Sequence, residues 1–545
     1  MATGMVLTVA QTLLSALQTK ELRELCSLFD HESQLADLER TVETITLRTL
    51  LCPCLFLDQV SWQPNVAIIL ENCRRLRVLD LNGLHISALR NTLNNLSHLR
   101  YLDLSFNFDL KRLPKSISKL YNLQVLKLEG CARLEELPED LRELVNLRHL
   151  DITNCYLLTH MPAGMGSLIS LRTLSMFILG GGSSDQVQID QLRELMPLNN
   201  LRGKLKIIFR EGYSYNATNA DEGSSLLSKK HIKALVIEED EANYRIPIIL
   251  DERLLEFLQP HHDLRLIKIF GYISIRLPDW AAAIAANLPL LVRICLKHFE
   301  GLQHLPQLSQ LRHLKFLQLE GMPNVDYMEY DKGTIPFFPS LEELSLGKFP
   351  KLKGWWRLEV GEEREAVIPV FSRLHYLTIF NCPNLTYFPG IPHVKEVSLT
   401  KFNEALTFCK ASPTPTDHAS SSSDIGYDNK VGDEVISLNT LDIDNVGSVN
   451  YVFGESSESI RSLKLILSEV ESLSSFAESY VRLALSIEKL EFKYCLNLKS
   501  LLGGGLEHMV NLQSLVIKEC CNLELEEDED GMPWKAFHKL IHFDL

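Results

Sequence analysis

The sequence lacks the long apolar run that a membrane-spanning helix would need. Its most apolar stretch, residues 281–292, is interrupted by Asn287 and Pro289, and it is well short of the roughly 20 apolar residues that cross a bilayer. The first 17 residues lack the basic start of a secretory signal and carry polar residues within an amphipathic pattern. We therefore expect no membrane span and a cytoplasmic location.

The sequence also lacks a recognisable catalytic or metal-binding motif. No nucleophile-elbow or zinc-protease motif occurs. Neither Cys52-Pro-Cys54 nor Cys520-Cys521 has a second ligand pair at the spacing of a zinc site, and His261-His262-Asp263 precedes a predicted strand, which favours a turn. We expect no enzyme activity and no bound metal.

An excess of basic residues is missing as well. The chain has 70 acidic and 55 basic residues and a formal net charge of −15, which argues against broad attraction to nucleic acid or anionic lipid. The acidic run at residues 524–530 is interpreted as a solvated loop. With 46% hydrophobic residues, the chain has enough apolar side chains for a large core.

What the sequence does contain is a repeat. The pattern Leu-x-x-Leu-x-Leu recurs with starts 23 or 24 residues apart, at Leu76, Leu99, Leu123, Leu147 and Leu171. A Leu-Pro or Met-Pro pair follows in three of these units, at Leu113-Pro114, Leu137-Pro138 and Met161-Pro162. This period is typical of leucine-rich repeats, in which each unit adds one strand to a parallel sheet. The predicted fold is an α/β leucine-rich-repeat solenoid with a curved parallel sheet on its concave face.

A small polar or thiol residue follows each strand at one fixed offset. It is Asn107, Cys131 and Cys155 in successive units, and we expect these side chains to be buried and to bond the backbone of the turning chain. Cys382, Cys495 and Cys520 have the same offset in later units. Because no secretory signal is present, we expect the 12 cysteines to be reduced.

We divide the chain into a helical segment at residues 1–46 and a repeat domain at residues 47–545, with about eighteen irregular repeats and loops near 180–186 and 409–434. Apolar residues at helical spacing indicate two helices in the first segment. The chain stops at the strand core of a repeat, and since a solenoid needs a polar cap over its last apolar layer, we expect the carboxyl end to be incomplete.

The stretch "LRYLDLSFNFDLKRLPKSISKLYNLQVLKLEGCARLEELPEDL", with "LRGKLKI" and "LKGWWR" further on, resembles the repeat domain of plant coiled-coil/NB-ARC/leucine-rich-repeat disease resistance proteins of the RGA-like type. Residues 5–45, with "SQLADLERTVETI", are similar to the start of that family's Rx-type coiled coil. The resemblance implies a defence-response protein with a leucine-rich-repeat recognition module. That module would bind a pathogen effector or a guarded host protein, and coiled-coil or receptor partners are also implied.

The nucleotide-binding switch of that family is missing from the sequence. No Gly-x-x-x-x-Gly-Lys-[Ser/Thr] loop, whose backbone amides would cradle phosphates, occurs anywhere. We therefore expect no cofactor, because the resemblance implies ADP or ATP only for an intact family member. Our hypothesis is an internal deletion near residues 45–47.

Side chains between the core leucines should point to the concave surface, because successive strand residues alternate faces. The candidate partner-binding residues are Tyr101, Asp103, Ser105, Val125, Lys127, Glu129, His149, Asp151 and Thr153, together with Trp355 and Trp356. For each single residue a solvated strand face is the alternative, and for the tryptophans it is packing against the return loops.

Three alternatives to a defence-response recognition module are less favoured by the sequence. A leucine-rich-repeat adaptor or substrate receptor of a ubiquitin ligase would need an adaptor-binding helical motif that residues 1–46 do not resemble. A receptor-kinase ectodomain would need a secretion signal and a spanning helix. The chain could also be the non-functional product of a damaged gene.

Overall fold

The computed structural model describes the repeats in several stretches, which fall into two compact units, residues 1–248 and 249–545. The described residues are 48–51, 74–89, 91–180, 191–210, 226–239, 250–329, 337–356, 370–403, 405–408, 438–444, 462–469, 485–497, 509–523 and 542–544. The predicted helices at 1–46 lie outside this part of the chain, as do the predicted loops near 180–186, apart from Gly180, and 409–434.

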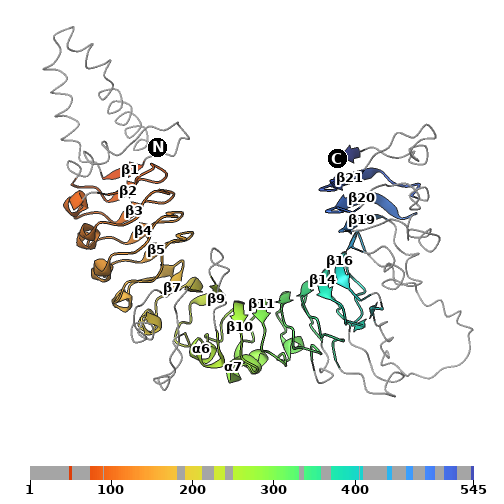
Figure 1. Ribbon diagram of the computed structural model, residues 1–545. Coiled ribbons are helices and arrows are strands. Elements are labelled where there is room, and N and C mark those ends of the chain that lie inside the picture. The colour runs from red at the N-terminus through yellow and green to blue at the C-terminus, as the bar shows by residue number, and fades with distance from the viewer. Residues whose placement is uncertain are drawn as a thin grey trace, which may run out of the picture. The chain divides into compact units, whose positions relative to one another are not determined.

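Unit 1 begins with a six-stranded parallel sheet whose strands follow one another in chain order (Figure 1). They are β1 (Thr49–Leu51), β2 (Val78–Asp80), β3 (Tyr101–Asp103), β4 (Val125–Lys127), β5 (His149–Asp151) and β6 (Thr173–Leu174). Each strand is short because only one or two leucines per repeat reach the core from it. Leu79, Leu102, Leu126 and Leu150 pair in register across the sheet and are at most 1% exposed.

Short 3-10 helices return the chain to the next strand. They are η1 (Asn91–Asn95), η2 (Lys115–Lys119), η3 (Glu139–Glu143) and η4 (Met165–Ser167), and they lie on the side of unit 1 away from the strands (Figure 1). Pro114 and Pro138 are the residues before η2 and η3, both in extended conformation. Proline suits this position because it has no backbone N–H to donate to a ladder. The predicted return segment is thus confirmed for these repeats.

Unit 1 continues with β7 (Phe177–Leu179) and two longer strands, β8 (Gly203–Phe209) and β9 (Ile232–Glu239), which pair in parallel in that order. The repeat period is less regular after Phe177. The strands here are also longer, since β8 and β9 run for seven and eight residues. Lys229 is fully buried before β9, where its ammonium donates to the Met196 carbonyl and the Asn199 side-chain oxygen, each at 3.2 Å.

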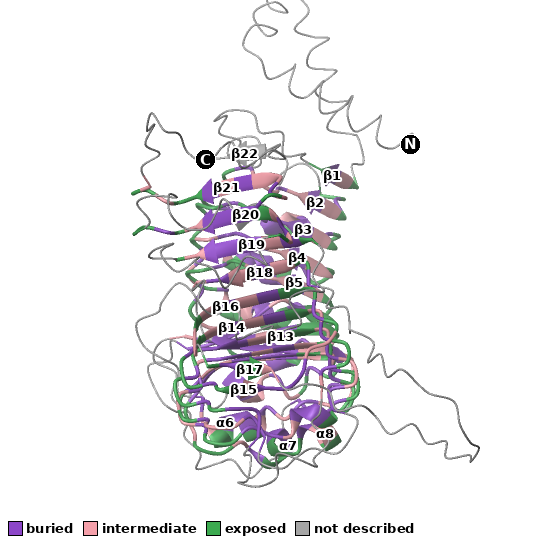
Figure 2. Cartoon of the chain, turned by 90° about the vertical axis from the view of Figure 1, so that its right-hand side faces the viewer, coloured by how far each residue is buried: buried purple, intermediate pink, exposed green. Residues whose placement is uncertain are grey.

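Unit 2 repeats the arrangement with strands of up to seven residues (Figures 1 and 2). Its parallel strands are β10 (Leu266–Tyr272), β11 (Arg293–Phe299), β12 (Phe316–Glu320), β13 (Glu343–Gly347), β14 (Tyr376–Cys382), β16 (Glu396–Phe402), β18 (Thr440–Ile443), β19 (Leu463–Ser468), β20 (Ile487–Lys493), β21 (Ser514–Lys518) and β22 (His542–Asp544). β15 (Tyr387–Phe388) and β17 (Thr407–Phe408) form a separate pair. The helices are α6 (Glu252–Phe257), α7 (Asp279–Ala282), α8 (Ile284–Asn287) and η6 (Leu308–Gln310).

The side chains after the strands form the predicted buried ladder. The Asn107 amide donates to the carbonyls of Leu81 and Leu104 at 2.9 and 2.8 Å and accepts from the Ile86 N–H at 2.9 Å. The thiols of Cys131 and Cys155 lie 3.2 Å from the carbonyls of Leu104 and Leu128. Cys382 and Cys495 are likewise buried, whereas Cys520 is only half-buried. Among the described cysteines no disulfide forms.

The described residues contain no helix that is both long enough and apolar enough to cross a membrane.

Candidate binding surface

The face formed by the outward side chains of β2 to β5, together with the second residue after each strand, is called here the strand face. In-register pairing places Tyr101, Val125 and His149 in one row across three strands. Asp103, Lys127 and Asp151 form the next row. Backbone hydrogen bonds from Phe106 to Glu129 and from Gly130 to Thr153 continue this alignment beyond the strand ends. The nine strand residues predicted from the sequence therefore lie together as a grid of three by three.

Tyr101, Asp103 and Lys127 form a network within this grid. The Tyr101 hydroxyl donates to the Asp103 carboxylate at 2.8 Å, and the Lys127 ammonium lies 3.7 Å from the same oxygen and 5.7 Å from the centre of the Tyr101 ring. Burial, the hydrogen bond to Asp103 and the charge of Asp103 raise the pKa of Tyr101. The tyrosine is therefore a neutral donor, held in one orientation.

Two members of the grid are less accessible than the sequence suggested. Asp103 is 4% exposed and Ser105 is 2% exposed, because the second carboxylate oxygen of Asp103 accepts the Ser105 N–H at 3.0 Å. Asp151 makes the same bond to the Thr153 N–H at 3.1 Å. Asp103 and Ser105 are therefore not the contact residues that the sequence had predicted. Asp103 instead holds Tyr101, Lys127 and the turn after the strand in place.

His149 differs from its neighbours in carrying a ring that titrates near neutrality. Its Nδ1 atom lies 2.8 Å from the Thr173 hydroxyl. Burial and the positive charges of Arg172 and Arg148 lower its pKa. At neutral pH the ring is therefore uncharged, and because Nδ1 bonds Thr173, only Nε2 remains to bond a partner.

The two predicted tryptophan anchors are wrong as surface residues. Trp355 and Trp356 are 1% and 3% exposed. The Trp355 ring packs edge-on at 5.2 Å from the centre of the Phe371 ring and 5.6 Å from that of Phe388, and Phe337 contacts both tryptophans. They belong to an aromatic cluster inside unit 2. This agrees with the alternative predicted for them, which was packing against the return loops. Their large area is buried against other rings and is not available to a partner.

The outward residues of the unit 2 strands carry ion pairs that the sequence analysis missed. Glu320 pairs with Lys297 at 3.0 Å and Lys348 at 2.8 Å. Burial alone would raise the pKa of Glu320, but hydrogen bonds from both lysines lower it. Lys297 and Glu320 have the same offset in successive repeats and Lys348 lies one residue further, so the sequence shows the contact only once the register is known.

A second buried carboxylate, Glu491, lies among three lysines. Lys464 is 2.6 Å away, Lys518 is 2.9 Å away and Lys493 is 3.8 Å away. Burial opposes ionisation, but hydrogen bonds from Lys464 and Lys518, with the charges of Lys464 and Lys493, lower the pKa of Glu491 to about 2. Glu491 is therefore ionised at neutral pH.

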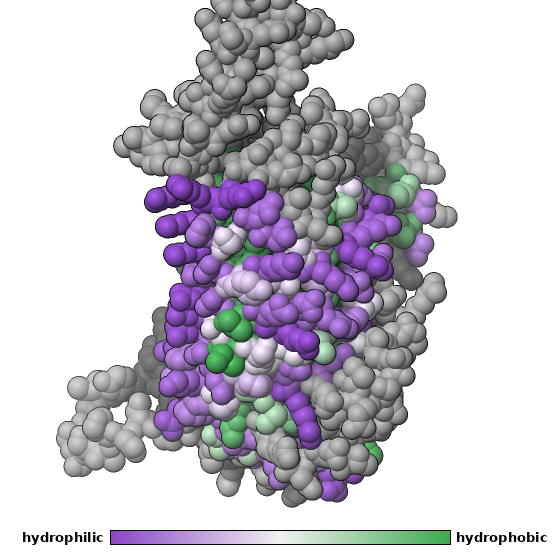
Figure 3. Space-filling model, turned by 90° about the vertical axis from the view of Figure 1, so that its left-hand side faces the viewer, coloured by the Kyte–Doolittle hydropathy of each residue, from purple (hydrophilic) through white to green (hydrophobic). Residues whose placement is uncertain are grey.

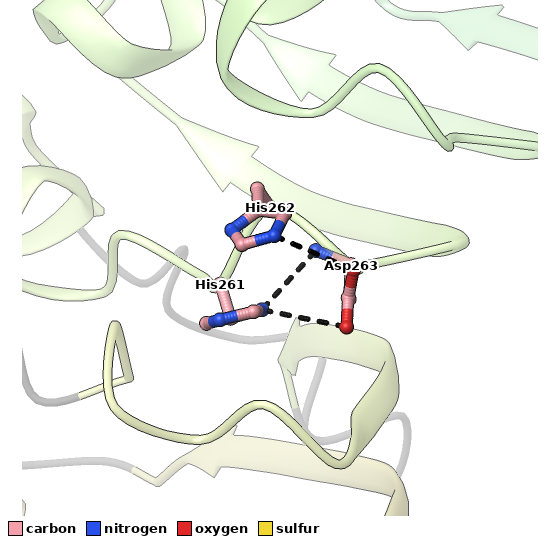
Figure 4. Close-up of side chains that lie close together, drawn as sticks. All are labelled: His261, His262 and Asp263. Carbon is pink, nitrogen blue, oxygen red and sulfur yellow. Dashed lines mark hydrogen bonds and ion pairs between the residues drawn. The ribbon is translucent and has the colours of Figure 1, made fainter.

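His261, His262 and Asp263 lie close together, as Figure 4 shows, but they behave as a turn. Their possible ligand atoms all lie within 4.8 Å of one another. The Nδ1 atom of His261 accepts the backbone N–H of Asp263 at 3.2 Å, and β10 begins three residues later. Since that nitrogen already accepts a local bond, the interpretation as a turn stands.

A hollow of about 550 Å³ in unit 2 is lined only by polar side chains, among them Asn324, Asp326 and Lys351. Sites for small molecules are mostly apolar with a few polar groups. The outer side of the chain in Figure 3 is also mainly hydrophilic, with small apolar groups between. These surfaces suit contact with a macromolecule better than enclosure of a small ligand.

The comparison with known proteins agrees with the repeat pattern. A family model described as "Leucine-rich repeat region" matches residues 57–366, which is more than half of the chain. The chain belongs to the leucine-rich-repeat family. Its strands, return helices and buried leucines are those of this family's repeats, as predicted.

The chain is similar to three disease resistance proteins of Solanum bulbocastanum. Putative disease resistance protein RGA1 is 39% identical over 271 residues, which are 49% of this chain and 26% of that protein. Disease resistance protein RGA2 is 30% identical over 158 residues, covering 29% of this chain and 15% of that protein. The chain thus matches about a quarter or less of these relatives' length. The predicted resemblance to RGA-like proteins is confirmed for the repeat region.

Two solved structures are also similar to the chain. A leucine-rich-repeat protein of Leptospira interrogans is 17% identical, with 88% of this chain and 98% of that chain covered at a TM-score of 0.32. The functional domain of InlJ from Listeria monocytogenes is 12% identical, with 78% of this chain and 70% of that chain covered at a TM-score of 0.39.

Proposed function

We propose that this chain is a recognition module of plant disease resistance, and that its strand face binds a pathogen effector or a guarded host protein. The support is the similarity of its repeats to proteins named disease resistance proteins. Leucine-rich repeats use their stacked strands as an extended binding surface. We propose further that this recognition takes place in the cytoplasm and requires neither a catalytic step nor ADP or ATP.

The observation that carries the proposal is the grid of outward side chains on β3, β4 and β5. Tyr101 and Lys127 are fixed by Asp103 before any partner arrives, so little side-chain entropy is lost on binding. Val125 and His149 are half-buried beside them. A tyrosine, an aliphatic side chain and a lysine in adjacent rows provide apolar contact area and charge together, which is the mixture found in protein interfaces.

Proximity labelling in plant tissue tests the proposal. The double variant Val125→Arg/Glu129→Lys changes the strand face, and Val145→Arg/Glu143→Lys makes the same two substitutions at exposed positions before β5 and on η3. We expect the first variant to lose the partner that the wild type labels and the second to keep it. Loss in the second variant alone would place binding on the return side and overturn the proposal.

The identity of the labelled protein adds a second criterion. A pathogen effector or a host protein that such an effector modifies would support the role in defence. Recovery of a ubiquitin-ligase adaptor instead would favour the substrate-receptor alternative. For the proposed independence from nucleotide, calorimetric titration with ADP and ATP should show no heat of binding, and tight binding would contradict it.

A further inference from the structure

A ladder of arginines runs along unit 1 immediately before the strands. The Arg77 N–H donates to the Arg48 carbonyl, the Arg100 N–H to the Arg77 carbonyl, the Arg172 N–H to the Arg148 carbonyl and the Arg202 N–H to the Arg172 carbonyl. Gln124 is the one rung that is not an arginine, and it joins Arg100 to Arg148 by the same bonds. We call Arg48, Arg77, Arg100, Arg148, Arg172 and Arg202 the arginine column.

The backbone holds this column rigidly. The carbonyls of Arg77, Arg100 and Arg148 each accept two N–H groups from the next repeat, at 2.7 to 3.0 Å. Neighbouring parallel strands lie about 4.8 Å apart, so the six intervals from Arg48 to Arg202 span roughly 29 Å. The guanidinium groups therefore leave the chain from evenly spaced, fixed points.

All six arginines are exposed, and none of them forms an ion pair with another residue in the part of the chain that the structure describes. Two exposed arginines elsewhere in unit 1 do have acidic partners. Arg112 pairs with Glu135 at 3.4 Å and Arg133 pairs with Asp109 at 2.9 Å. The column stands out as a line of like charges without such a counter-charge.

Like charges at this spacing repel one another, and a bound anion relieves that repulsion. The effect of the column reaches the strand face, where the charges of Arg172 and Arg148 help to lower the pKa of His149. Guanidinium groups bind carboxylates and phosphates with two parallel hydrogen bonds. An anion with several charges in a line would therefore suit the column.

The rest of the strand face restricts which anion fits. Two half-buried carboxylates, those of Asp80 and Asp151, lie three residues further along the strands than the column, in the row that also holds Lys127. A duplex nucleic acid or an anionic membrane covers a broad area and would meet these carboxylates, and the chain as a whole carries −15. A narrow line of carboxylates on a protein avoids them.

The spacing of the rungs points to the shape of that protein segment. Side chains three and four residues apart on an α-helix lie about 5 to 6 Å apart, close to the strand spacing of about 4.8 Å. Side chains on one face of an extended strand repeat every 6.4 to 6.8 Å or so, and they lose register with the column within two or three rungs. We propose that the arginine column binds an acidic α-helix of the protein partner, with carboxylates along one side. This inference rests on the proposed function, since it describes how that partner is recognised.

Fluorescence anisotropy of a labelled helical peptide tests the proposal on the full chain. The probe is an alanine-based peptide of about 20 residues, which spans about 30 Å as a helix, with glutamates at intervals of three and four along one side. A second peptide has the same composition with the glutamates spread around the helix. We expect the one-sided peptide to bind about tenfold more tightly at low salt, because only it meets several arginines at once.

Matched variants locate the binding. Arg148→Gln/Arg172→Gln should weaken binding about tenfold, and Arg112→Gln/Arg133→Gln, which removes the same charge from the return side, should leave it unchanged. Gln124→Arg should tighten it severalfold by filling the gap in the column. The proposal is overturned by equal binding of the two peptides, by equal effects of the two double variants, or by tighter binding of oligo-dT or phosphatidylserine vesicles through the column.

The outcome is separable from that of the proposed function. Failure of the peptide experiment, with partner labelling still lost in Val125→Arg/Glu129→Lys, overturns the role of the column and leaves the strand face as the recognition surface. Binding of the peptide, with partner labelling unaffected by that variant, overturns the proposed function instead.

Discussion

The ring of Phe380 occupies the space that a side chain on Gly347 would need. These two residues pair across β13 and β14, and a Cβ atom on Gly347 would come within 2.0 Å of the Phe380 Cζ atom. Glycine is therefore required at this position by its neighbour in the next repeat.

We predict that Gly347→Ala destabilises unit 2 by about 1 to 3 kcal/mol, the usual cost of forcing an extra atom into a packed site. A lower midpoint of urea denaturation followed by circular dichroism would measure the change. Adding Phe380→Ala to the glycine variant should restore part of the loss, because it empties the space that the new methyl group enters. An unchanged midpoint in Gly347→Ala would contradict the contact.

The stability of unit 2 should depend on Glu491 at acid pH. Because its folded pKa is lowered to about 2, its stabilising effect is present above the unfolded value of about 4.3 and is lost as pH falls toward 2. Glu491→Gln should cost about 1 to 2 kcal/mol at neutral pH, discounted because the three lysines keep contact with water. It should also flatten the pH dependence of unfolding between these values.

A suitable control is Glu342→Gln, which breaks the exposed pair with Lys315 at 2.7 Å. We expect a change below about 1 kcal/mol there, as is usual for surface ion pairs. Equal losses in the two variants at neutral pH would show that the burial of Glu491 does not matter.

Asn107 should be the most sensitive position of the buried ladder. Its side chain bonds one N–H and two carbonyl groups from neighbouring turns, and leaving buried polar groups without partners costs about 1 to 3 kcal/mol each. We predict a loss of about 2 to 4 kcal/mol for Asn107→Ala and a smaller loss for Asn107→Cys. Asn122→Ala, at an exposed asparagine that bonds only the Ser97 carbonyl, should change the urea midpoint little.

The buried thiols should resist alkylation in the folded protein. Burial raises the pKa of Cys131 to about 11 and that of Cys382 to about 12, so neither forms a thiolate at pH 8. Iodoacetamide at that pH should modify the exposed Cys521 and spare these two until the protein is unfolded. Mass spectrometry of peptides would show this, and equal labelling of Cys131 and Cys521 would contradict it.

The sequence predicted the strands well because their spacing is a local property. The strands recur at a nearly constant interval, which Leu76, Leu99 and Leu123 mark. Cys131 and Cys155 follow their strands at a fixed offset, which places their thiols beneath the turn. A repeat pattern thus contains both the position and the burial of these residues.

Burial away from the regular pattern was not predictable in the same way. Trp355 and Trp356 lie after a strand, in a segment whose neighbours in space are Phe337, Phe371 and Phe388. Only the packing of three successive repeats shows that those rings enclose them. The burial of Asp103 was not predicted either, because the alternation of strand residues places it on the outward face, where Tyr101, Ser105 and Lys127 surround its carboxylate.

The arginine column was visible in the sequence and was missed. An arginine follows the first leucine of six repeats of unit 1, at Leu47-Arg48, Leu76-Arg77, Leu99-Arg100, Leu147-Arg148, Leu171-Arg172 and Leu201-Arg202. The candidate contact residues, such as Tyr101 and Asp103, lie after this position in each unit. The register of the parallel strands turns a recurrent dipeptide into a continuous line of charge.

Gln124 interrupts the arginine column, and recombination between repeats of the gene can remove this interruption. Unequal crossing-over between repeats that removed residues 124–147 would join Leu123 directly to Arg148 and keep the leucine pattern intact. The product would be one repeat shorter, and its arginines would follow one another without interruption. One recombination event can therefore lengthen an unbroken line of charge without a point mutation, and duplication of residues 124–147 instead would widen the gap to two glutamines.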